Sequence, residues 1–117
     1  MARVVAVFDD LLLGSNVQGM LAAGGHDTTL APPMSADPAG SDVLIVDVGQ
    51  DGFDAVGLVA RLRASGALDG VSVLGIYSHV HVEQRQAAEA AGFDLVVPRS
   101  RLMREGAALV ERLASGR

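Results

Sequence analysis

The sequence predicts an α/β fold in which a doubly wound, five-stranded parallel sheet is covered by helices on both faces. Short apolar runs of strand length, rich in valine, alternate along the chain with longer segments of helical periodicity. The runs lack polar alternation, which is typical of parallel strands that helices cover on each side. We expect one domain over residues 1–117, because this length is sufficient for a single hydrophobic core.

The first part of the chain contains three expected strands and one helix. RVVAVF, residues 3–8, is a continuous apolar run, and residues 26–30 form a short β-prone segment. Between them, residues 11–25 place apolar side chains at helical intervals and end on two glycines, a helix-stop signal. Residues 31–41 carry three of the four prolines and predict a loop with at most one helical turn. DVLIVD, residues 42–47, is the next strand.

The second part alternates regularly between helix and strand. Residues 53–66 have helical spacing and end on a glycine, and VSVLGIY, residues 71–77, is a strand. Residues 82–92 are an alanine-rich helix that also ends in glycine, and they lead into a short strand at 94–97. An amphipathic helix over 102–114 completes the pattern. The order of elements matches a flavodoxin-like sheet, with strand order 2-1-3-4-5 and a reduced second helix.

Acidic residues close two strands that this order makes neighbours. Asp9 and Asp10 end the first strand, and Asp47 ends the third. Ligands of open parallel sheets bind beyond the carboxyl ends of the strands where the strand order reverses, so we expect these acids to share one pocket. Three close carboxylates repel each other, and a hard divalent cation such as Mg²⁺ relieves that repulsion.

Taken singly, these acids have a second interpretation as helix N-caps. Asp10 precedes the helix that begins at Leu11, and Asp51 or Asp54 precedes the next one. Both interpretations stay open at this point.

Composition limits the classes of function. The formal net charge is −5 and no basic stripe is present, so we expect no direct contact with nucleic acid. The chain has no cysteine, no apolar run of the roughly 18 residues that a membrane span needs, and no signal-peptide pattern. We therefore expect a cytoplasmic protein that does not enter a membrane.

Over essentially its whole length, the chain resembles the receiver domain of bacterial two-component response regulators. The resemblance rests on VFDD at the end of the first strand, LIVD at the end of the third, GIYS at the end of the fourth, and AAGFDLVVP entering the fifth. In that family an acidic pair holds Mg²⁺ and an aspartate accepts a phosphoryl group. A Ser or Thr contacts that phosphoryl group, and a lysine pairs with it.

The resemblance assigns a role to each matching position. Asp9 and Asp10 match the metal pair, with Asp10 favoured as the direct ligand. Asp47 matches the phosphoacceptor, which also contacts the metal, and Ser78 matches the hydroxyl position. Together these residues imply phosphoryl transfer to a carboxylate oxygen with Mg²⁺ present.

Several family features are missing, which makes the chain an atypical or degenerate receiver. It contains no lysine, and Pro98 followed by Arg99 stands at the lysine position. Arg99 could substitute for the lysine, although its planar guanidinium is longer and not equivalent. His79 replaces a small residue and could act as a pH-sensitive gate, and Leu95 stands where many members carry an aromatic switch residue.

We therefore expect a stand-alone signalling module that acts by binding a protein partner, either a sensor kinase, an output protein or a second copy of itself. In one version Asp47 is phosphorylated with Mg²⁺, and in the other, which we favour, the fold serves as a constitutive interaction domain. We expect no enzymatic turnover beyond self-phosphorylation from a phosphodonor. The alternative is a small enzyme or cofactor-binding domain. It would use the acidic corner, formed by Asp9, Asp10 and Asp47, for Mg²⁺-assisted phosphate chemistry.

The three consecutive leucines at 11–13 give a further expectation. A helix start cannot bury three adjacent side chains on one face, so one of the three should face away from the core. This leucine could contact a partner, although ordinary packing also accounts for the sequence.

Overall fold

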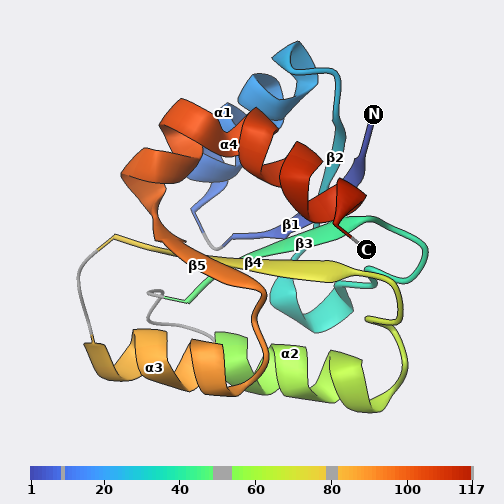
Figure 1. The fold of residues 1–117 in the computed structure, drawn as a ribbon, viewed down its shortest axis with the longest axis vertical. Coiled ribbons are helices and arrows are strands. Elements are labelled where there is room, and N and C mark those ends of the chain that lie inside the picture. Colours follow the sequence, from blue (N-terminus) through green and yellow to red (C-terminus); the bar gives the residue numbers. More distant parts are fainter. Residues whose placement is uncertain (9, 49–53, 79–81, 117) are drawn as a thin grey trace.

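The computed structural model describes residues 1–8, 10–48, 54–78 and 82–116. Five strands form one parallel sheet in the order β2-β1-β3-β4-β5, which confirms the predicted topology (Figure 1). The strands are β1 (Arg3–Val7), β2 (Asp27–Leu30), β3 (Val43–Asp47), β4 (Ser72–Tyr77) and β5 (Leu95–Pro98).

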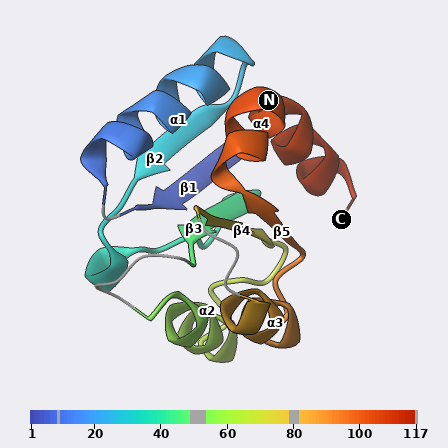
Figure 2. The same cartoon turned by 90° about the vertical axis from the view of Figure 1, so that its left-hand side faces the viewer.

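Helices cover both faces of this sheet. Figure 2 shows α1 and α4 together on one face and α2 and α3 together on the other. The helices are α1 (Leu11–Ala23), α2 (Ala55–Ala64), α3 (Val82–Ala90) and α4 (Arg99–Ser115), with one 3-10 turn, η1 (Pro33–Ser35). Among the described residues, none of the helices combines the length and the apolar character that a membrane span requires.

The sheet separates the core into two layers. Ile45 and Leu74 face the layer under α1 and α4, whereas Leu44 and Val73 face the layer above α2 and α3, and all four side chains are fully buried. Every residue of β3 and β4 is buried, as the uninterrupted apolar runs predict for central parallel strands.

Coverage is incomplete at the β2 edge, as the predicted reduction of the second helix implies. Along β2, Asp27 and Thr29 are exposed while Thr28 is buried, and Arg3 of β1 is exposed on the adjoining strand. The physical reason is that the connection after β2 forms only η1. No full helix covers this part of the sheet, and polar side chains occupy the open face.

The last helix begins three residues before the predicted boundary. Pro98 ends β5 and also serves as the N-cap of α4, with φ −62° and ψ 150°. The helical chain therefore starts at Arg99, whereas the apolar periodicity becomes visible only at Leu102, the first buried residue of the helix. Polar first-turn residues do not contribute to an apolar pattern, so periodicity placed the start too late.

Candidate functional site

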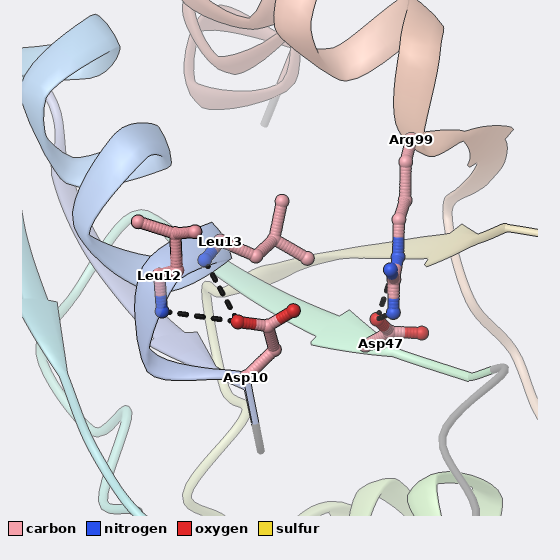
Figure 3. Close-up of polar contacts among 5 residues, drawn as sticks. All are labelled: Asp10, Leu12, Leu13, Asp47 and Arg99. Carbon is pink, nitrogen blue, oxygen red and sulfur yellow. Dashed lines mark hydrogen bonds and ion pairs between the residues drawn. The ribbon is translucent and has the colours of Figure 1, made fainter.

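Asp47 and Arg99 form an ion pair at the carboxyl edge of the sheet (Figure 3). Nε of Arg99 donates to Oδ2 of Asp47 at 3.0 Å, and a terminal nitrogen of the same guanidinium donates to the same oxygen. The Asp47 side chain is fully buried, and that of Arg99 is 27% exposed. The pair connects the end of β3 to the first residue of α4, 52 positions along the chain.

Strand register explains why these two residues meet. Asp47 lies opposite Ile76 of β4, and Tyr77 of β4 lies opposite Pro98 of β5. The three strands therefore end at the same edge, with β3 and β5 about 10 Å apart at two strand spacings. Arg99 follows Pro98 directly, and its long side chain extends back across the end of β4 to reach Asp47.

Asp10 lies at the same edge and caps α1. Its Oδ1 accepts hydrogen bonds from the backbone N–H groups of Leu12, at 3.0 Å, and Leu13, at 3.1 Å (Figure 3). Val7 pairs with Val46 in the sheet, so Asp10 and Asp47 follow the same end of neighbouring strands. The structure therefore confirms the interpretation of Asp10 as a helix N-cap. Asp54 likewise caps α2, by accepting from the N–H of Gly57 at 2.9 Å.

Of the remaining predicted residues, the structure describes Ser78. Ser78 comes directly after β4, two positions beyond the partner of Asp47, and its side chain is exposed. Asp9 lies outside the described residues, as do Asp51 and His79, so their predicted roles stay predictions.

The described acids do not form an open magnesium site. Oδ2 of Asp47 is already bound by a guanidinium, and Oδ1 of Asp10 already accepts two backbone hydrogen bonds. Within the described ranges, no group of three metal-ligating side chains comes together. A magnesium ion at either of these two oxygens would have to share or replace contacts that the protein makes by itself, and its binding at this corner stays a prediction.

An apolar cleft of about 450 Å³ adjoins the acidic corner, and it was not predicted. Its walls come from the residue after β1, the start of α1, the end of β2 and the connection that follows β2. The lining includes Phe8, Leu11, Leu30 and Pro32, and Asp10 contributes a polar side chain. Leu11 is 79% exposed and Leu12 is 73% exposed, so two leucines of the run, rather than the one expected, face solvent. The proline-rich segment 31–41 was the sequence signal for this opening, because it replaces a covering helix.

Comparison with known proteins bears on the fold. No protein-family model and no curated protein matches the sequence. Among solved structures, the receiver domain of the Francisella response regulator 1452 superposes with a TM-score of 0.83 at 18% identity, covering 99% of this chain and 98% of that one.

Two further solved structures give the same result. The signal receiver domain of NarL from Mycobacterium tuberculosis has a TM-score of 0.83 at 22% identity, with 99% of this chain and 98% of that one covered. The Vibrio cholerae chemotaxis protein CheY4 has a TM-score of 0.82 at 21% identity, with 97% and 98% covered. The chain therefore has the receiver-domain fold that the sequence motifs predicted.

Proposed function

We propose that this chain is a signalling module of the receiver type that acts by binding a protein partner, and that Asp47 controls this binding through Arg99. The ion pair between these residues carries the proposal. A buried carboxylate at the end of β3 is bonded to the first residue of α4, so a change in the charge of Asp47 acts directly on the start of that helix.

Electrostatics supports this coupling. A fully buried carboxylate is stable only when a positive charge or several hydrogen-bond donors balance it. If Asp47 is modified or neutralised, the guanidinium loses its partner, and the first turn of α4 loses the contact that ties it to β3. A protein that contacts α4 would bind the two states with different affinities, and this difference is what a signal requires.

Phosphoryl acceptance at Asp47 is the second candidate, and the position of Asp47 at the carboxyl edge favours it. A carboxylate oxygen of Asp47 would attack phosphorus, and the bond from phosphorus to the donor would break with its electrons on the leaving group. Arg99 would then pair with the phosphoryl oxygens, and the hydroxyl of Ser78, at the same edge, would donate a hydrogen bond to them. We propose no turnover of an external substrate.

Intact-mass measurement tests the second candidate. The protein is incubated with a small phosphodonor in the presence of Mg²⁺ or of a chelator, with Asp47→Asn as the matched control. Addition of one phosphoryl group, absent from the control, supports acceptance at Asp47. No mass gain in either condition would argue against phosphoryl acceptance at Asp47, and turnover of phosphate esters without an adduct would indicate the enzyme alternative instead.

Comparative capture from a cell extract tests the partner proposal. Wild type, Asp47→Asn and Arg99→Ala are used as bait beside Arg61→Ala, which removes an exposed arginine of α2. We expect at least one protein whose recovery changes several-fold with the two site variants and not with Arg61→Ala. Identical recovery from all four baits would refute control through Asp47.

A further inference from the structure

We propose that the guanidinium of Arg99 is a built-in counterion that takes the place of a metal ion at Asp47, so that the acidic corner is held together without Mg²⁺. The inference concerns the site on which the proposed function rests, and it specifies how the charge of that site is balanced.

The charge on Asp47 is neutralised from within the chain. Its side chain is fully buried, and two nitrogens of one guanidinium bond its Oδ2. Arginine stays protonated at every ordinary pH, so this positive charge is permanent. The chain has no lysine, and all nine of its basic residues are arginine. The corner therefore has a fixed cation where a divalent ion would otherwise be needed.

A magnesium ion would meet two obstacles at this corner. It binds oxygen ligands in near-octahedral geometry, and Oδ2 of Asp47 already accepts from Arg99. A divalent ion beside that oxygen would also lie close to the guanidinium, and the two positive charges would repel each other.

Asp10 presents a further cost. Its Oδ1 accepts from two backbone N–H groups at the start of α1. Turning Oδ1 toward a metal would leave both groups without their cap, so Asp10 can offer a metal only its other carboxylate oxygen while it caps α1. The wild-type corner should therefore disfavour a metal, and the removal of Arg99 should admit one.

Thermal unfolding with increasing MgCl₂ at constant ionic strength tests this inference. We expect the Tm of wild type to stay constant. Arg99→Ala should have a lower Tm without Mg²⁺ and a saturable rise in Tm with Mg²⁺, because an ion that binds only the folded state stabilises it by mass action. Arg99→Lys keeps a positive charge, so its Tm should not rise with Mg²⁺.

Matched variants separate a site-specific response from a general salt effect. Arg61→Ala removes one exposed arginine of α2 and should behave as wild type. Asp47→Asn/Arg99→Ala removes both partners and should show no Mg²⁺ response. If Arg99→Ala does not fold, the wild-type amide NMR signals of Val46 and Asp47 provide the test, and we expect them not to move with Mg²⁺.

Two outcomes would overturn the inference. One is a saturable Mg²⁺ response in wild type that equals or exceeds that of Arg99→Ala. The other is no response in either protein, which would mean that Arg99 does not occupy the place of a metal. Neither outcome refutes the proposed function, because the capture experiment compares Asp47 and Arg99 variants whether or not a metal binds.

Discussion

The ring of Phe93 packs directly against the backbone of Gly75 in the middle of β4. A Cβ atom built on Gly75 would lie 2.8 Å from Cδ2 of Phe93 and 3.3 Å from Cγ1 of Val48. Phe93 is buried and belongs to the core layer on the α2 and α3 side of the sheet. The absence of a side chain at Gly75 therefore allows the segment before β5 to lie close against the sheet.

Replacing Gly75 by alanine should destabilise the fold. The new methyl group requires the Phe93 ring to move within a packed layer, and overpacking of this kind costs about 1–3 kcal/mol. Urea denaturation measures the loss in free energy of unfolding. Gly19→Ala is the matched control, because Gly19 is in α1 with nothing within 4 Å of the added Cβ. It should stabilise the protein by about 0.5–1 kcal/mol. Equal effects at both positions would contradict the packing argument.

The energetic link between Asp47 and Arg99 can be measured by a double-mutant cycle. Arg99→Ala leaves a buried carboxylate without its counterion and should cost about 3 kcal/mol, the low end for a buried pair because Arg99 is 27% exposed. Asp47→Asn/Arg99→Ala should lose less stability than Arg99→Ala alone, since the uncompensated charge is gone. Chemical denaturation of the four proteins gives the coupling energy, and simple additivity of the single losses would contradict the importance of the pair.

Much of this site was predictable from sequence because it depends on topology. The apolar runs that end in LIVD and GIYS indicated neighbouring parallel strands. Parallel strands that end together bring their terminal residues to one edge of the sheet. Asp10 as an N-cap was also readable, since it directly precedes the helix start at Leu11. These features are local, or follow from strand order.

The contacts that were not predictable depend on distant parts of the chain. Whether Arg99 points toward Asp47 is decided by the start of α4, and the polar first turn of that helix hides its start from periodicity. The open face beside Asp27 and Thr29 was also not predictable. Whether these polar side chains lie on an uncovered face depends on the positions of the elements before and after β2.

Two substitutions at Asp10 separate its capping role from its charge. Asp10→Ala removes the acceptor for the N–H groups of Leu12 and Leu13 and should lower the free energy of unfolding by about 1 kcal/mol. Asp10→Asn retains a capping oxygen and should stay within a few tenths of a kcal/mol of wild type. Thermal or urea denaturation distinguishes the two variants. If Asn is as harmful as Ala, then the carboxylate charge, not the cap, is what the fold uses.

The His26 side chain should be fixed in one neutral tautomer. The ring is 6% exposed; Nδ1 accepts from the backbone N–H of Ala2 at 3.1 Å, and Nε2 lies 3.2 Å from the carbonyl oxygen of Ala107 in α4. An amide N–H can only donate and a carbonyl oxygen can only accept, so Nδ1 must carry the lone pair and Nε2 the hydrogen. Nitrogen-15 NMR of the imidazole at neutral pH should show the Nε2–H form, and a dominant Nδ1–H signal would contradict this arrangement.

Removing the His26 ring should cost more stability than truncating the exposed side chain of its neighbour Asp27. His26→Ala leaves the buried N–H of Ala2 without its acceptor, at about 1–3 kcal/mol, and also removes the additional contact of the Ala107 carbonyl, which keeps its place in the hydrogen bonding of α4. The contact joins the start of β1 to the middle of α4, so amide hydrogen exchange should also accelerate in α4 around Ala107. Asp27→Ala changes the next residue, whose side chain is exposed, and should stay within about 0.5 kcal/mol of wild type. Similar losses in the two variants would mean that the His26 bridge contributes little to holding α4 against the sheet.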